Sequence, residues 1–276
     1  MTVEIEGVTL HLAHPDELPA RWVGQEEPLR QLLAAWLVID PRDVPMNPRL
    51  VGKPGVGKTT LAYAAAKRLK REVYIMQGTV DTRPEDLLVT PVIEGAGKLR
   101  HVASPLVTAM IRGGVVILDE GNRMSEKSWA SLAPLLDSRR YVESIVAGIK
   151  IKAHPDFRFV ATLNDDASTF DLPEYIHSRL QPQILIDFPE RDEEYLILRE
   201  NLPFGEEKIL QYVTEFLQQA HAADERYTVR DGINIGRFAM KLLRELSYID
   251  ESRALEAAVL ETLGEEALRY VPRVRS

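Results

Sequence analysis

The segment Gly52-Lys53-Pro54-Gly55-Val56-Gly57-Lys58-Thr59 constrains the fold of this chain more than any other feature. It has the spacing of a phosphate-binding loop, follows a short apolar run and opens an alanine-rich helical pattern at Thr60. Glycines let the backbone wrap phosphates with its NH groups, and the helix start adds positive potential. We therefore expect Lys58 to reach the β- and γ-phosphate oxygens and Thr59 to hold Mg²⁺.

Short apolar runs alternate with helical patterns between residues 49 and 188, which indicates strands joined by crossover helices. The expected strands are Arg49 to Val51, Val73 to Gln77, Val115 to Leu118, Phe159 to Leu163 and Ile184 to Phe188. The predicted fold is an α/β, P-loop NTPase sandwich of three layers with a parallel five-stranded sheet. After Pro189 only helical patterns follow, so we expect domains at 1–189 and 190–276, the second a small α-helical lid.

Two stretches interrupt this alternation, and each is typical of an inserted β-hairpin. One spans residues 92–102 and turns near 95–97, and the other spans 140–153 and turns at Gly148. Ordinary surface hairpins would give the same patterns.

Acidic and amide side chains follow two of the expected strands. Asp119 and Glu120 end the third strand, and Asn164 ends the fourth. Ligands of parallel sheets bind at the carboxyl ends of the strands. Asp119 is therefore expected to contact Mg²⁺, and Glu120 to polarise the water that attacks the γ-phosphate. Asn164 either orients that water or marks an ordinary strand end, since asparagine is common there.

Composition excludes several classes of protein. Forty-two acidic against thirty-four basic residues give a net charge of -8, which disfavours a nucleic-acid or lipid partner. The chain has no cysteine, and its histidines show no metal-ligand spacing, so no metal other than Mg²⁺ is expected. No signal sequence and no apolar run near the roughly 18 residues of a membrane span are evident, so we expect a cytoplasmic protein. No base-reading motif of a GTPase occurs.

Further motifs occur in order around these residues. They are Trp22-Val23-Gly24-Gln25, Pro84-Glu85-Asp86-Leu87-Leu88, Ser104-Pro105-Leu106, Asp119-Glu120-Gly121-Asn122-Arg123, Leu135-Leu136-Asp137, His154-Pro155 and His177-Ser178-Arg179-Leu180. The ordered set, over about residues 21–189, resembles the helix-2-insert branch of the AAA+ ATPases, and most closely the MoxR-type ATPases.

The resemblance implies a role for each matching residue. ATP would be bound by Asp119 and by the residues of the phosphate loop and helix start: Gly52, Pro54, Gly55, Val56, Gly57, Lys58, Thr59 and Thr60. Val23 and Gly24 would line the adenine pocket. Glu120 would be the general base and Asn164 the sensor 1 residue. Arg179 would reach the γ-phosphate of a neighbouring subunit, although its spacing alone favours a surface arginine. Arg230, or Arg237 in its place, would be the sensor 2 residue, and Arg123 would couple subunits or form a structural ion pair.

The function that the resemblance implies is a ring-forming ATPase, expected to be a hexamer, that remodels, activates or matures a protein client. The hairpins at 92–102 and 140–153 would contact that client, and a protein with a von Willebrand factor A domain is an expected partner. A nucleic-acid-dependent motor or loader is a first alternative, and a nucleotide-gated assembly switch with low turnover is a second. A small-molecule kinase would leave Asn164 and Arg179 without a role.

Overall fold

The computed structural model describes residues 1–19, 22–94, 98–165, 172–246 and 249–272. The chain divides into two compact units. The first comprises Met1–Pro19, Glu26–Gly52 and Lys58–Ile186; the second comprises Lys53–Gly57, the short segment that ends at Gln25, and the chain from Asp187 onward. Each unit has its own hydrophobic core.

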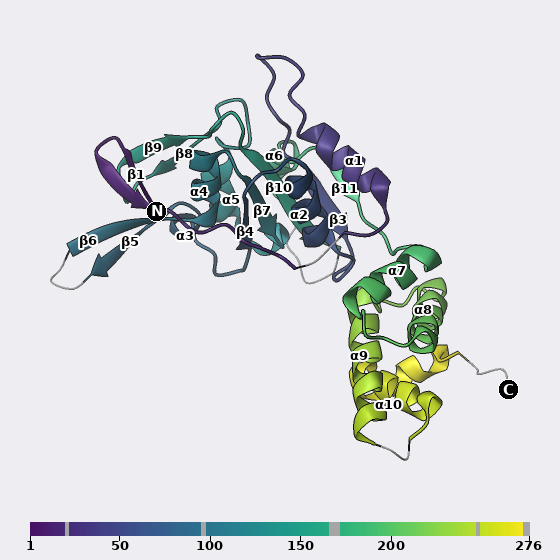
Figure 1. Cartoon of the computed structure of the whole chain (residues 1–276). Coiled ribbons are helices and arrows are strands. Elements are labelled where there is room, and N and C mark those ends of the chain that lie inside the picture. Colours follow the sequence, from purple (N-terminus) through teal and green to yellow (C-terminus); the bar gives the residue numbers. More distant parts are fainter. Residues whose placement is uncertain (20–21, 95–97, 166–171, 247–248, 273–276) are drawn as a thin grey trace. The chain divides into compact units, whose positions relative to one another are not determined.

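A parallel five-stranded sheet forms the centre of the first unit (Figure 1). Its strands are β3 (Arg49–Gly52), β4 (Val73–Gln77), β7 (Val115–Asp119), β10 (Arg158–Asn164) and β11 (Gln183–Leu185). They lie in the order β11-β3-β10-β7-β4. The predicted α/β fold with five parallel strands is therefore confirmed. The last strand ends at Leu185 rather than at Phe188, because its partner β3 enters the phosphate loop after Gly52.

Helices cover both faces of this sheet. Their bounds are α1 (Glu26–Ala35), α2 (Lys58–Arg68), α3 (Pro84–Leu87), α4 (Pro105–Arg112), α5 (Glu126–Leu132) and α6 (Glu174–His177), with a 3-10 turn η2 (Gly121–Arg123). Residues of α4 and α5 form one hydrophobic core with alternate residues of β7 and β10. Helix α2 does not belong to that core; it contacts strands of the sheet and packs on α1. Helix α4 begins where the Ser104 side chain accepts a hydrogen bond from Val107 N, and ends at Gly113, which has φ 71°.

A second sheet contains the first inserted hairpin. Strands β5 (Val89–Glu94) and β6 (Lys98–Ala103) pair antiparallel, and their turn, at 95–97, lies outside the described residues. The amino-terminal strands β1 (Thr2–Ile5) and β2 (Val8–His11) add to it in the order β1-β2-β6-β5. Sequence reasoning did not predict this amino-terminal hairpin, whose turn at Glu6 (φ 49°) and Gly7 (φ 81°) is of a kind that favours hairpins.

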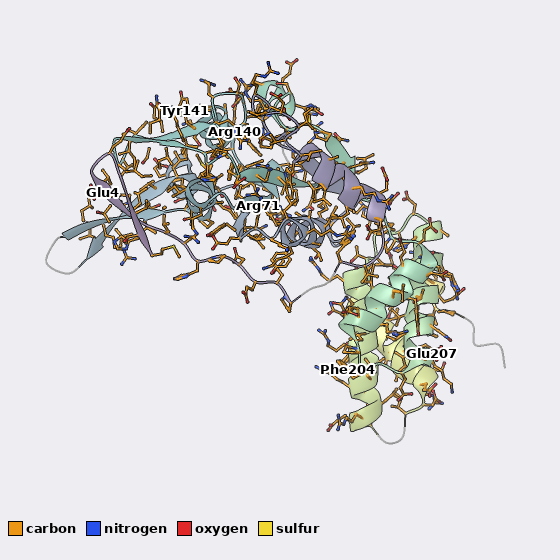
Figure 2. All side chains as sticks on the ribbon, turned by 45° about the horizontal axis from the view of Figure 1, so that its top comes forward. Glu4, Arg71, Arg140, Tyr141, Phe204 and Glu207 are labelled. Atoms are coloured by element: carbon orange, nitrogen blue, oxygen red, sulfur yellow. The ribbon has the colours of Figure 1, made fainter. Side chains whose placement is uncertain are left out.

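The other hairpin consists of β8 (Tyr141–Ser144) and β9 (Ile149–Lys152), which pair antiparallel. It begins at Arg140 and Tyr141, both labelled in Figure 2. Val142, Ile149 and Ile151 point into the core of the first unit. The hairpin is thus anchored by one face and is not a free surface ribbon.

The part of the second unit from Asp187 onward is helical throughout its described residues. Its helices are α7 (Arg191–Asn201), α8 (Glu207–Ala222), α9 (Val229–Glu245) and α10 (Glu251–Leu263), followed by a 3-10 turn η3 (Glu265–Tyr270). Gly232 and Gly236 let α9 approach its neighbours, since a Cβ atom at Gly232 would lie 2.5 Å from Leu217 Cδ1. Among the described residues, no helix is long and apolar enough to cross a membrane.

Candidate active site

The phosphate loop lies between the end of β3 at Gly52 and the start of α2 at Lys58. Gly55 and Gly57 have φ values of 85° and 95°, a region that other residues rarely adopt. The Lys58 side chain is buried, and its Nζ donates a hydrogen bond of 2.8 Å to Gly52 O. Lys58 therefore reaches back to the first residue of its own loop, as expected of a lysine that binds phosphates held there.

Thr59 and Asp119 lie in direct contact. The Thr59 hydroxyl donates to Asp119 Oδ1 at 2.8 Å, and the hydroxyl of Thr162 on β10 donates to the same oxygen. The Thr59 hydroxyl and the Asp119 carboxylate are oxygen ligands of the kind that Mg²⁺ prefers. No group of three or more metal-ligating side chains occurs among the described residues. The pair thus fits a Mg²⁺ ion that takes its other ligands from phosphate and water, as is usual for this metal.

Glu120 is held in an unusual backbone conformation beside this pair. Its φ of 52° and ψ of 41° are left-handed, which is a strained conformation for a residue with a side chain. Its NH donates to Thr162 Oγ1 at 3.0 Å. Its carboxylate accepts a hydrogen bond of 3.1 Å from Asn164 Nδ2, and Arg123 Nε lies 2.8 Å from its other oxygen. The carboxylate is therefore fixed between an amide and a guanidinium.

Asn164 is positioned by Asn122, which sequence reasoning quoted in a motif but gave no role. The Asn122 side chain donates to Asn164 O at 2.8 Å and accepts from Asn164 N at 3.2 Å. Both asparagines are buried. Thr162 was also missed, because a threonine inside an apolar strand resembles any other β-branched residue. In the fold it accepts a hydrogen bond from Glu120 N and donates one to Asp119.

The parallel register explains why these residues meet. Asn164 is paired with Gly52 across β10 and β3, and Asp119 is paired with Gln77 across β7 and β4. The carboxyl ends of the central strands therefore form one edge, at which the phosphate loop also begins. The first unit thus brings together Lys58, Thr59, Asp119, Glu120 and Asn164.

Arg179 lies elsewhere in the first unit. Its Nη1 donates to Tyr175 O at 2.6 Å, and its Nε lies 3.4 Å from Asp137 Oδ2. Hydrogen bonds from Arg139, and then from Arg179, lower the pKa of Asp137 to about 2. Within the described part of the chain, no hydrogen bond or ion pair joins Arg179 to the residues around Glu120. The structure does not bring this arginine to the site of its own chain.

The remaining predicted residues belong to the second unit. Gly24 has φ 73°, and a Cβ atom there would lie 2.6 Å from Glu193 Oε1, which accepts a hydrogen bond of 2.7 Å from Gln25 N. Val23 is partly buried beside it. Gly55 of the phosphate loop lies against Thr228, whose NH is capped by Asp231 at 2.8 Å.

The two candidates for sensor 2 follow this cap on α9. Arg230 and Arg237 are both exposed, and neither side chain has a hydrogen bond or ion pair to a described residue. The structure therefore favours neither, and the sensor 2 residue stays a prediction.

The fold and the phosphate loop are those of a P-loop nucleotide-binding protein. Residues 49–180 match the family model of the AAA domain (dynein-related subfamily). This part of the chain, rather less than half of its length, is therefore similar to an AAA domain.

Two bacterial relatives match over most of their length. A Staphylococcus epidermidis protein is 25% identical over 232 residues, covering 80% of this chain and 85% of the relative. A Staphylococcus aureus protein is 24% identical over 229 residues, covering 81% and 87%. Both are described as uncharacterised, so they bring no activity to this chain.

Among solved structures, the RuvB Holliday junction branch migration motor of Thermotoga maritima is similar in fold. It has a TM-score of 0.60 and 20% identity, covering 88% of this chain and 72% of that chain. A putative ATPase from Cytophaga hutchinsonii has a TM-score of 0.53 at 17% identity, and covers 90% of this chain and 79% of that chain. Identities this low concern the fold alone.

Proposed function

We propose that this chain is a Mg²⁺-dependent ATPase of the MoxR type that works as a ring on a protein client. The observation that carries the proposal is the arrangement at the sheet edge: Glu120, fixed by Asn164, stands beside the Thr59 and Asp119 pair. A nucleotide-binding protein without hydrolysis would need the phosphate loop but not a fixed carboxylate next to the metal ligands.

Each residue of the site has one task in this proposal. The loop NH groups and Lys58 bind the phosphates, and Thr59 and Asp119 hold Mg²⁺, directly or through its water ligands. Mg²⁺, when bound, neutralises negative charge on the phosphate oxygens. The Glu120 carboxylate accepts a proton from the attacking water, and Asn164 orients both carboxylate and water. Arg179 of one subunit supplies positive charge to the γ-phosphate bound by the next, so turnover depends on a ring, which we propose is a hexamer.

The client-facing parts of the ring would be the two hairpins, β5–β6 and β8–β9. Exposed apolar side chains occur on both, with Ile93 77% and Ile145 94% exposed. Such residues fit contact with a partly unfolded or loosely packed protein segment. A partner with a von Willebrand factor A domain remains part of the proposal.

The substitution Glu120→Gln tests the assigned chemistry. We expect kcat for ATP hydrolysis to fall about 100-fold or more, because the amide cannot accept the proton, while Mg·ATP affinity is retained. Lys58→Ala is the matched control, since it should lose ATP binding itself. Isothermal titration and phosphate release measure the two quantities. Wild-type turnover by the glutamine variant would refute the assignment of the base.

A nucleotide-gated switch with low turnover is the second candidate. The ion pair between Glu120 and Arg123 favours it, because a carboxylate that is paired with a guanidinium is less free to accept a proton from water. The same phosphate-release assay separates the candidates. Continuous turnover by the wild-type chain supports the ATPase, and a single round of hydrolysis supports the switch. The net charge of -8 weighs against the nucleic-acid motor.

A further inference from the structure

The loop between α1 and β3 exposes an unusual amount of apolar surface. We call residues 37–46 the apolar loop; it projects from the first unit beyond the end of α1 (Figure 1). Its exposed large side chains are Leu37, Val38, Ile39, Val44 and Met46, and Ile39 is 82% and Leu37 61% exposed. A cluster of this kind on a soluble domain marks a surface that another molecule covers.

The apolar loop holds its own shape. At its base, Leu37 N donates to Ala34 O at 3.1 Å and Met46 N donates to Ala35 O at 2.9 Å. Two aspartates organise its tip. Asp43 Oδ2 accepts from Ile39 N at 3.1 Å, and Asp40 Oδ1 accepts from Arg42 N at 3.0 Å. The apolar side chains are thus presented on an ordered backbone, which lowers the entropic cost of docking.

The same surface contains Arg179. Val44, Pro45 and Met46 line a pocket of about 290 Å³ whose other wall includes Asp137 and Arg179. Asp137 holds the Arg179 side chain at this pocket. The apolar loop therefore borders Arg179, which, among the described residues, has no hydrogen bond or ion pair to the nucleotide site of its own chain.

We propose that the apolar loop is a contact between subunits, packing against the neighbouring copy of this chain and setting Arg179 against the nucleotide site of that copy. This inference rests on the proposed ring function. If Arg179 completes the neighbour's site, the surface around Arg179 is covered by that neighbour, and the apolar loop lies on this surface. The contact is head-to-tail, with the loop on one subunit only, as a ring requires.

The charges of the loop agree with a protein partner of this kind. Its one cation, Arg42, is paired with Asp40 at 2.8 Å, and Asp43 bonds to the backbone. No free cation of the loop is available for phosphates, so neither nucleic acid nor an anionic membrane is the occupant.

A single cysteine can report on this contact, because the chain has none. Ile39→Cys is labelled with an environment-sensitive fluorophore in the Glu120→Gln chain, and ATP is added over a range of protein concentrations. We expect a blue shift that rises with protein concentration and follows assembly in sedimentation velocity. Ile93→Cys, on the distant hairpin β5–β6, is the matched control, and the emission of its fluorophore should not shift as the chain assembles. A shift that is absent, or independent of protein concentration, would overturn the inference.

The double substitution Leu37→Ser, Ile39→Ser tests the consequence. Both positions are exposed, so the melting temperature should be that of the wild type. We expect ATP-dependent assembly to need at least about tenfold more protein, with kcat reduced at low concentration and ATP affinity per subunit unchanged. Phe204→Ser, which changes an exposed apolar residue of the second unit, should behave as the wild type.

The outcomes separate this inference from the proposed function. A loop variant that assembles at wild-type concentrations refutes the loop contact and leaves the ring intact. A wild-type chain that stays monomeric with Mg·ATP at every concentration refutes the ring, and with it the loop contact.

Discussion

Glu120 is the residue at which the backbone departs furthest from what its amino-acid type prefers. A left-handed conformation at a glutamate costs of the order of 1–3 kcal/mol and persists only where surrounding contacts impose it. Those contacts are the Thr162 hydroxyl on its NH, and Asn164 and Arg123 on its carboxylate. Strain of this kind is concentrated at functional sites, and here it turns two neighbouring acids, Asp119 and Glu120, in different directions.

Asn122 gives a residue-scale test that does not touch the acids. Asn122→Ala should lower the free energy of unfolding by about 1–3 kcal/mol, because Asn164 N and O lose buried partners. It should also lower kcat while leaving KM nearly unchanged, since Asn164 would be less well positioned. Denaturant titration and steady-state kinetics measure these effects. Asn201→Ala, which removes an exposed amide, is the control. An equal loss of stability in that variant would contradict a stabilising role for the buried hydrogen bonds between Asn122 and Asn164.

At the scale of elements, the packing of α7 on α8 includes a fully buried carboxyl group. Glu194 has no exposed surface, and Gln218 Nε2 donates to its Oε2 at 2.8 Å. Its Oε1 is buried without a hydrogen-bond partner. Burial raises the pKa of Glu194 to about 7, which the bond from Gln218 only partly offsets. The helical part of the second unit therefore prefers a protonated acid at its centre.

This preference makes stability depend on pH. The folded chain binds the Glu194 proton more tightly than the unfolded chain, so its contribution is complete below pH 4.5 and is lost as the pH rises to about 7. The free energy of unfolding should fall by up to about 3 kcal/mol over that range. Glu194→Gln should flatten this dependence, whereas Asp192→Asn, an exposed acid on the same helix, should preserve it. Denaturant titration at several pH values measures this dependence. If the free energy of unfolding of Glu194→Gln varied with pH as in the wild type, Glu194 would not be the group responsible.

At the scale of the whole molecule, the proposed site lacks, among the described residues of one chain, a second cation for the γ-phosphate. Lys58 belongs to the phosphate loop and Arg123 is engaged by Glu120, while Arg179 is held by Asp137 at a different surface. The proposed ring would resolve this separation, because the arginine surface of one copy would meet the nucleotide surface of the next. The proposed role of the apolar loop is to bring those surfaces together.

Mixing two inactive variants tests this arrangement. Arg179→Ala and Lys58→Ala chains should each hydrolyse ATP poorly, and an equal mixture should recover about a quarter of wild-type sites, where an intact Lys58 adjoins an intact Arg179. Phosphate release from the mixture measures the recovery. Arg139→Ala, which removes the other arginine on Asp137, should not need complementation. No recovery in a mixture that still assembles would place the missing cation within one chain.

The sequence by itself determined the local features: the phosphate loop, the five apolar strands, the acids after one strand and the helices after Pro189. Each depends on residue spacing and periodicity along the chain, which local physics controls. Tertiary structure alone decided what lies across strands, including Thr162 between Asp119 and Glu120, Asn122 on Asn164, and the amino-terminal hairpin beside β6. Those contacts depend on parallel register between distant segments, which no local pattern records. The separation of Arg179 from its own site was likewise decided by the fold, because only the arrangement of α6 in space shows which surface that arginine occupies.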